Sequence, residues 1–295
     1  MKIYVFISII LLCFASCKQH VAREAFDQVT TNHIGAQANT IYLADYENIE
    51  YGFGNVLKHF KTKQQITDSI EQIYQGISKE FLLGKYNPAE DSNFVRIPSH
   101  MSLRKGLYCH RETFNAFNEL REAALEDGIN LKITSAMRSF HYQKQIWERK
   151  WQMYHMGTTD DIAADIHTVL TIMRYSSMPG TSRHHWGTEL DLNSTEVNYW
   201  LTGEGKQIFQ WLCEHAGQYG FFQPYDNSAE RTGYEEERWH WSYKPLSDIY
   251  LNAYTHNINS SELHGFHGSY LVDSLDILQR YVHGIAKEDA KGIKQ

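Results

Sequence analysis

The sequence predicts an α+β fold in which helices pack on one face of a small antiparallel sheet, with an added N-terminal helical segment. Apolar residues recur at helical spacing from Lys63 to Phe81 and from Arg111 to Glu126, and the second segment stops at Asp127-Gly128. Residues Leu131 to Thr134 instead alternate apolar with polar, as in a strand buried on one face. Helical segments mixed with short alternating ones are typical of the α+β class.

Two more helices are expected on either side of Tyr154. One runs from about Phe140 to Met153, directly after the predicted strand, so that Arg138 lies where the strand gives way to the helix. Residues at such junctions are often held rigidly beside a functional site. The other runs from about Asp160 to Arg174, and we interpret it as part of an insertion or lid-like element.

Composition limits the classes of ligand. The chain has 295 residues, of which 42% are hydrophobic and 14% aromatic, as expected for a compact globular protein. Its formal net charge is -7 and it has no stripe of Lys and Arg, which argues against binding nucleic acid. A small or peptide ligand is favoured, and any anionic group on it must be recognised by one or two placed residues.

The N-terminus predicts export. An apolar run from Ile3 to Phe14 follows Lys2 and ends in Ala15-Ser16-Cys17, and it is too short to span a bilayer comfortably. It is similar to the signal peptide and lipobox of bacterial lipoproteins, which implies lipidation of Cys17. The alternative is a cleaved secretory signal in which the Cys is incidental.

These features predict the organisation of the chain. Residues 1–17 are the signal peptide, the polar residues 18–40 are a tether, and residues 41–290 are a single domain with an N-terminal helical extension. We expect an exported lipoprotein, anchored to the membrane through Cys17 and facing the periplasm or cell envelope. In the predicted domain, Cys109 and Cys213 are too far apart in sequence for a structural metal motif; they form either a disulfide or two free thiols.

Two segments carry candidate chemistry. The first reads S-R-H-H-W-G-T-E-L-D-L-N from Ser182, where Glu189 and Asp191 share one face of a strand-like alternation. The second reads E-E-E-R-W-H-W-S-Y from Glu235 and again alternates as a strand, with His240 on one face. His184, in the turn before the first strand, can reach the same point as Asp191.

Two imidazoles and one carboxylate are a catalytic rather than a structural zinc ligand set, because they leave a position open for water. We therefore predict one zinc ion bound by His184, Asp191 and His240. A general base must stand beside the water, and Glu237 can enter the site from a loop just before the second strand. No H-E-x-x-H helix occurs in the chain.

The combination resembles the VanY-type D-alanyl-D-alanine carboxypeptidases, within the group of zinc peptidases that includes lysostaphin, D-Ala-D-Ala metallopeptidases and the zinc domain of hedgehog. The pattern S-x-H-x-x-G-x-x-x-D followed by E-x-W-H is met by seven positions. These are Ser182, His184, Gly187, Asp191, Glu237, Trp239 and His240. In that family the two histidines and the aspartate bind zinc and the glutamate is the base.

A third block, S-A-M-R-S-F-H-Y-Q, resembles the S-G-Y-R-S-x-x-x-Q segment of the same family. The resemblance implies that Arg138 lies beside the scissile amide, where it orients substrate and stabilises the developing oxyanion. It also implies that Gln143 and Ser182 contact substrate. The likeness extends from Leu82 to about Tyr281.

The chain departs from the family pattern at two positions. Glu189 replaces a small residue two positions before the metal Asp, and Arg238 replaces the Pro of E-P-W-H. Neither change removes a ligand, and Glu189 is a candidate partner of a metal ligand. His185 has no partner pattern and is interpreted as an ordinary surface or hydrogen-bonded histidine.

The expected activity is that of a zinc-dependent D-alanyl-D-alanine carboxypeptidase that trims peptidoglycan stem peptides. This expectation rests on the resemblance and on the predicted export. No residue in the sequence by itself indicates a preference for D-amino acids. The alternatives are an endopeptidase or dipeptidase with the same zinc chemistry and, in another class, a non-catalytic zinc-binding lipoprotein. Glu237 and Arg138 favour an enzyme, because a binding protein needs no base.

Overall fold

The computed structural model describes residues 71–158 and 161–286, and the chain divides into two units, Met1–Ile77 and Ser78–Gln295. The predicted signal peptide, Cys17 and the tether lie outside the described residues. In the first unit, residues 71–76 are helical. The account below concerns the second unit.

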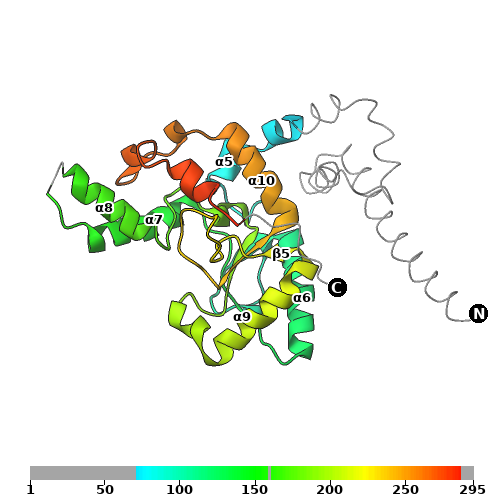
Figure 1. Cartoon of the computed structure of the whole chain (residues 1–295). Helices are drawn as coiled ribbons and strands as arrows, with labels where there is room; N and C mark the ends of the chain where they lie inside the picture. Colours follow the sequence, from blue (N-terminus) through cyan, green and yellow to red (C-terminus); the bar gives the residue numbers. More distant parts are fainter. Residues whose placement is uncertain (1–70, 159–160, 287–295) are drawn as a thin grey trace, which may run out of the picture. The chain divides into compact units, whose positions relative to one another are not determined.

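The second unit contains helices and short strands in alternation (Figure 1). The helices are α5 (Lys79–Leu82), α6 (Arg111–Glu126), α7 (Phe140–Tyr154), α8 (Ile162–Ile172), α9 (Gly203–His215) and α10 (Lys244–Asn257). The strands are β1 (Phe94–Arg96), β2 (Tyr108–His110), β3 (Ile133–Ser135), β4 (Glu189–Leu192), β5 (Phe221–Phe222) and β6 (His240–Tyr243). Short 3-10 turns include η2 (Arg183–Trp186), η3 (Val197–Leu201) and η4 (Ala216–Tyr219).

The main sheet has the strand order β3-β4-β6-β5, and each neighbouring pair is antiparallel. Strands β1 and β2 form a separate antiparallel pair. In the centre of the main sheet, Leu190 lies opposite Trp241 and Asp191 lies opposite His240. Since side chains alternate between the faces of a strand, the first pair and the second pair point to opposite faces. The α+β class with a small antiparallel sheet is confirmed.

One face of the sheet carries the hydrophobic core. Leu190 and Trp241 belong to a buried cluster with Phe117 and Leu120 of α6 and Leu212 of α9. Each fully buried side chain of this size contributes roughly 1.5–3 kcal/mol to folding relative to an exposed one. Helices α6 and α9 contribute to this core, whereas α10 lies on the other side of the unit (Figure 1), so the helices are not confined to one face as predicted.

Most of the predicted helices are found where the sequence pattern placed them. Helix α6 has the expected bounds, is capped by Nδ1 of His110, which accepts a hydrogen bond from the Glu112 N–H at 3.3 Å, and is followed by Gly128 at φ +77°. Helix α7 begins after Ser139, whose Oγ accepts from the Tyr142 N–H. Helix α8 falls within the predicted 160–174 segment.

The helix predicted over 63–81 is wrong at its C-terminal end. The helical residues 71–76 stop before Ile77, and α5 starts again after Ser78, whose Oγ accepts a hydrogen bond from the Phe81 N–H at 3.1 Å. Ser78 therefore acts as an N-cap instead of continuing the earlier helix. The residues from 63 to 70 lie outside the described part of the chain.

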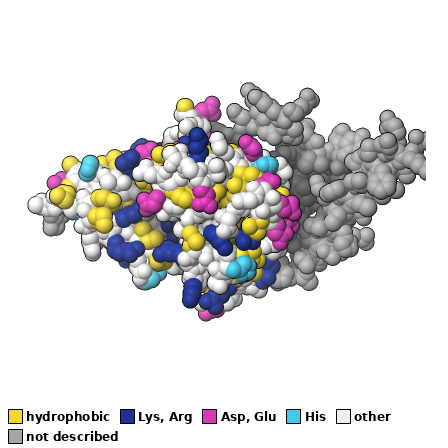
Figure 2. Space-filling view, turned by 90° about the horizontal axis from the view of Figure 1, so that it is seen from below, with side chains coloured by type: hydrophobic (Ala, Val, Ile, Leu, Met, Phe, Trp, Pro, Cys, Tyr) yellow, Lys and Arg dark blue, Asp and Glu magenta, His cyan; other side chains and the backbone are white. Residues whose placement is uncertain are grey.

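Helices α7 and α8 pack against each other as a hairpin that extends from the body of this unit (Figure 1). Among the described residues, no helix combines the length and apolar character that crossing a bilayer demands. On the face shown in Figure 2, cationic, acidic and hydrophobic side chains are interspersed. Of the two alternatives for the cysteines, the structure has free thiols, with Cys109 buried and Cys213 exposed.

Candidate metal centre

The second face of the main sheet carries polar side chains. Glu189 and Asp191 of β4 point to this face, opposite Ser242 and His240 of β6 in the antiparallel register. All four are at least nine-tenths buried. Buried polar groups must find hydrogen-bond or ion-pair partners, so these side chains form a polar cluster that is separate from the apolar core.

His184 comes from η2, the turn that precedes β4, and its ring orientation is fixed by the backbone. Its Nδ1 lies 2.7 Å from the carbonyl oxygen of Ala136, which can only accept, so Nδ1 carries the proton and Nε2 keeps a lone pair. The Nε2 atom is buried without a hydrogen-bond partner and lies 3.2 Å from Oδ1 of Asp191. Gly187 ends this turn at φ +72°, where an added Cβ would lie 2.4 Å from the Phe94 ring.

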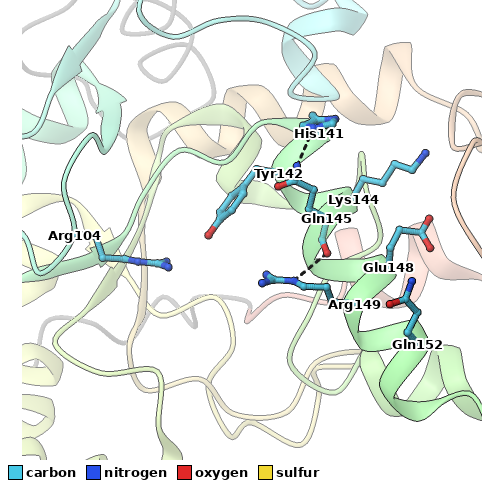
Figure 3. A pocket seen from close by; sticks show the side chains of 8 residues that line it. All are labelled: Arg104, His141, Tyr142, Lys144, Gln145, Glu148, Arg149 and Gln152. Atoms are coloured by element: carbon cyan, nitrogen blue, oxygen red, sulfur yellow. Dashed lines mark hydrogen bonds between the residues drawn. The ribbon is translucent and has the colours of Figure 1, made fainter.

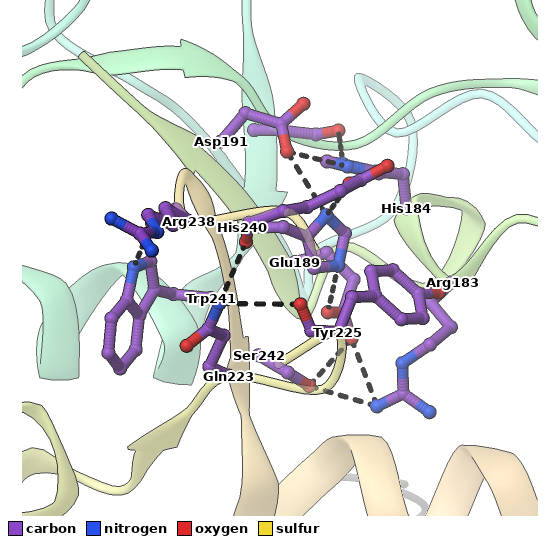
Figure 4. Close-up of polar contacts among 12 residues, drawn as sticks. Arg183, His184, Glu189, Asp191, Gln223, Tyr225, Arg238, His240, Trp241 and Ser242 are labelled. Carbon is purple, nitrogen blue, oxygen red and sulfur yellow. Dashed lines mark hydrogen bonds and ion pairs between the residues drawn. The ribbon is translucent and has the colours of Figure 1, made fainter. Parts of the chain in front are cut away.

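His240 stands across from His184, with ring centroids 4.8 Å apart and planes at 85°. Its Nδ1 is 3.1 Å from Oδ1 of Asp191, and its Nε2 is 2.8 Å from Oε2 of Glu189 (Figure 4). Asp191 Oδ1 therefore lies between the two imidazoles. Burial lowers the pKa of His240, but the hydrogen bonds with Asp191 and Glu189 outweigh it and raise the pKa to about 9.

The arrangement of His184, Asp191 and His240 fits a metal ion. One ligand atom from each residue lies within 4.8 Å of the others, and all three side chains are buried. Ligand atoms about 2.0–2.2 Å from a tetrahedral zinc ion lie roughly 3.3–3.6 Å from each other, close to the separations of 3.1 and 3.2 Å from Asp191 to the imidazoles. The unpartnered Nε2 of His184 is the kind of buried atom that a metal satisfies.

Glu237 lies beside this cluster, in the loop that leads into β6. Its backbone N–H donates to the carbonyl of Tyr225 at 2.9 Å, and its Oε2 is 3.7 Å from Nδ1 of His240. The residue is only 6% exposed, and burial raises the pKa of Glu237 to about 7. A carboxylate poised near neutral pH can accept and release a proton.

Arg138 lies in the turn between β3 and α7. Its N–H donates to the carbonyl of His184 at 3.1 Å, and its own carbonyl accepts from Nδ1 of His185 at 2.6 Å. The side chain is half-buried, and its Nε atom is buried without a partner. Burial and, after it, the nearby Arg138 cation lower the pKa of His184 to about 4, so the guanidinium acts electrostatically on the site.

A known protein family matches the segment of the chain that carries this site. Residues 106–246 match the VanY D-alanyl-D-alanine carboxypeptidases, and they include the three candidate ligands, Glu237 and Arg138. Residues 106–246 are thus similar to the VanY family. The resemblance inferred from the sequence motifs is thereby confirmed.

Two curated proteins are similar to the chain. The "Putative carboxypeptidase YodJ" of Bacillus subtilis (strain 168) is 27% identical over 184 residues, which are 59% of this chain and 60% of that protein. A Haemophilus influenzae protein without a described function is 31% identical over 80 residues, which are 23% of this chain and 61% of that protein. The chain thus spans about 60% of the length of each curated relative.

Solved structures of zinc and cell-wall carboxypeptidases are also similar. VanYB in complex with D-Alanine-D-Alanine has a TM-score of 0.43 and 23% identity, covering 56% of this chain and 84% of that one. The LdcB LD-carboxypeptidase has a TM-score of 0.42 and 23% identity, covering 60% and 81%. DacB from Streptococcus pneumoniae D39 has a TM-score of 0.35 and 24% identity, covering 59% and 83%.

Two further residues that the VanY resemblance implies as substrate contacts, Gln143 and Ser182, are both buried. The amide nitrogen of Gln143 donates to the carbonyl of Ser177 at 2.7 Å, while its amide oxygen has no hydrogen-bond partner. The hydroxyl of Ser182 has none either. These free polar atoms are compatible with substrate contacts, and the assignment stays a prediction.

Three residues around the VanY-type site had no identifying motif in the sequence. His185 is fully buried and holds the carbonyl of Arg138, in line with its interpretation as a hydrogen-bonded histidine. The ring of Tyr225 lies 4.8 Å from that of His240. Burial lowers the pKa of Lys150 in α7 and Arg138 lowers it as well, while Glu237 opposes this change, so Lys150 interacts electrostatically with both residues.

A separate cavity of about 490 Å³ lies along α7. Arg104 and residues of that helix, including Lys144 and Arg149, line it (Figure 3). None of its lining residues belongs to the metal cluster or contacts Glu237. It is therefore distinct from the candidate metal centre.

Proposed function

We propose that the protein is a zinc-dependent D-alanyl-D-alanine carboxypeptidase that trims the stem peptides of peptidoglycan. The observation that carries this proposal is the buried cluster of His184, Asp191 and His240 with Glu237 beside it, inside a segment similar to the VanY family. The similarity to that family supports peptidase chemistry on peptidoglycan, and the donor atoms suit zinc.

A zinc ion bound by these three residues would supply a Lewis acid and lower the pKa of a water molecule. Glu237 then accepts the proton of the attacking water and delivers it to the leaving amine. Its pKa of about 7 lets one carboxyl group perform both transfers near neutral pH.

Arg138 performs the second task, which is to bind and orient the substrate. The hydrogen bonds from its N–H to His184 and from His185 to its carbonyl tie its backbone to the turn that carries a metal ligand. A guanidinium held in this way can pair with a terminal carboxylate or stabilise an oxyanion on the scissile carbonyl. A protein that only bound zinc would need neither Arg138 nor Glu237.

The substrate and the bond cleaved are tested directly with purified muropeptides. The zinc-loaded protein is incubated with stem peptides that end in D-Ala-D-Ala, and the products are identified by mass spectrometry. Release of a single D-Ala is the expected result. Release of a dipeptide or cleavage of a crosslink would assign the same chemistry to a dipeptidase or endopeptidase, and intact substrates would contradict the proposal.

We also propose that the protein is exported and held at the cell envelope through a lipidated Cys17. Support comes from the apolar run and the small residues before Cys17 in the sequence. Such a location would place the site next to peptidoglycan. Labelling with a fatty-acid analogue would identify the modified residue.

A further inference from the structure

Glu189 is a fully buried carboxylate that the chemistry proposed above does not use. It lies on β4, on the same face of the sheet as Asp191 and two residues before it. Its Oε2 atom is 2.8 Å from Nε2 of His240, and its Oε1 atom accepts from the hydroxyl of Ser242 at 2.7 Å (Figure 4). Both oxygens of this carboxylate are therefore engaged.

An ion pair with Arg183 also holds the Oε1 atom of this carboxylate. The Arg183 Nη2 atom lies 3.2 Å from Oε1 of Glu189 and donates to Ser242 Oγ at 2.9 Å. Arg183 is 1% exposed, and its guanidinium lies 5.0 Å from the Trp186 ring. Moving a charged carboxylate out of water costs several kcal/mol unless it is paired and hydrogen-bonded, so Glu189 is fixed in one orientation by these partners.

The contacts of His240 set which of its nitrogens can bind a metal. A carboxylate oxygen only accepts hydrogen bonds, so the Nε2 atom that faces Glu189 carries a proton. The Nδ1 atom also faces a carboxylate oxygen, that of Asp191, but Asp191 is itself a candidate ligand, so the neutral ring that binds an ion keeps its proton on Nε2 and offers the lone pair of Nδ1. His184 has the opposite arrangement, since Ala136 fixes the proton on Nδ1 and leaves Nε2 free.

We propose that Glu189 is the positioning residue of the metal centre: it accepts the Nε2–H of His240 and so presents Nδ1 to the ion. Arg183 and Ser242 act on the metal through Glu189, because they hold its second oxygen. The inference rests on the proposed zinc site. A partner of this kind orients the ring and strengthens the ligand, and its loss typically weakens metal binding 10–100-fold.

The first test is the zinc affinity of Glu189→Gln, measured by competition with a chromophoric chelator. The matched control is Glu235→Gln, which removes an exposed carboxylate paired with Arg174 at the surface. We expect Glu189→Gln to bind zinc roughly 10–100-fold more weakly and Glu235→Gln to bind like the parent. A folded Glu189→Gln variant with parental zinc affinity would overturn the proposal.

A second measurement does not depend on Glu189→Gln and covers the case in which that variant does not fold. Nitrogen-15 NMR of histidine-labelled, zinc-loaded parent protein identifies the protonated nitrogen of His240, with His240→Ala used to assign its signals. The expected result is a proton on Nε2 and metal on Nδ1, and metal on Nε2 would overturn the proposal. If instead the parent binds no zinc, the proposed function fails, which separates the two ideas.

Discussion

His185 donates a hydrogen bond from Nδ1 to the carbonyl oxygen of Arg138 at 2.6 Å, one residue along the chain from the histidine that faces Asp191. Its Nε2 accepts from the Gly180 N–H at 3.0 Å. Burial lowers the pKa of His185 to about 3, so the ring is neutral at physiological pH and can make both bonds. His184 and His185 thus fix the segment from Ala136 to Arg138 through two carbonyls.

This relationship predicts that His185→Phe weakens the fold. The ring bulk is kept, but a buried carbonyl and a buried N–H each lose a partner, at about 1–3 kcal/mol apiece. Urea unfolding should therefore show a loss of roughly 2–5 kcal/mol. His141→Phe, at an exposed position of α7, is the control and should be close to neutral. Equal stability of the two variants would show that the His185 bonds contribute little.

The stability of the protein should depend on pH through Glu112. Burial raises the pKa of Glu112 to about 7, above its value of roughly 4.3 in an unfolded chain. The folded state then binds the proton more tightly than the unfolded state. The contribution of the protonated Glu112 carboxyl to the free energy of unfolding is therefore fully present below about pH 4.3 and is lost as the pH rises through 7.

We expect Glu112→Gln to raise the free energy of unfolding at pH 8 by on the order of 1–3 kcal/mol, and to change it little at pH 4.5. The favourable interaction of a carboxylate with the start of α6 opposes this by only about 0.3–1 kcal/mol. Glu119→Gln, exposed on the same helix, is the control. An identical effect of Glu112→Gln at both pH values would contradict the assignment.

Zinc content should depend on both histidines of the cluster. His184→Ala and His240→Ala each remove one nitrogen ligand, so dialysed protein should contain far less than one equivalent of metal. Elemental analysis measures this, with His141→Ala as the control. Full zinc content in both cluster variants would place the metal elsewhere.

Arg138 should affect substrate binding and turnover but not the metal. Arg138→Ala removes a cation that faces the site, so we expect a higher KM together with a kcat lower by about 10²–10³-fold. Arg138→Lys should recover only part of the activity, because an ammonium lacks the planar fork of a guanidinium. Steady-state kinetics on D-Ala-terminated peptides, with zinc content measured in parallel, check this, and unchanged kinetics would remove Arg138 from the site.

The metal cluster was predictable from sequence because strand alternation dictates which side chains share a face. Asp191 and His240 lie on the same face of the sheet, and the register of β4 and β6 sets them opposite each other. The same alternation put Glu189 on this face. Its partners were not predictable, since a shift of one residue in the register would have paired Glu189 with a different side chain of β6.

The helix between 63 and 81 shows where periodicity misleads. The isoleucine spacing continues through Ile77, but Ser78 offers its hydroxyl to the Phe81 N–H and starts a new helix. The role of His185 could not be predicted either, because its partners are backbone groups of Arg138 and Gly180. A sequence motif does not show a hydrogen bond between a side chain and a backbone group that is distant in sequence.

The most direct test of the proposed chemistry is the activity of zinc-loaded Glu237→Gln on stem peptides that end in D-Ala-D-Ala. Glu237 is required for proton transfer and is not among the three candidate ligands, so the variant should fold and keep its zinc. Turnover should fall by about 10²–10⁴-fold relative to the parent, while Glu235→Gln should remain fully active. If Glu237→Gln cleaves these peptides as fast as the parent protein, Glu237 is not the general base and the proposed mechanism is wrong.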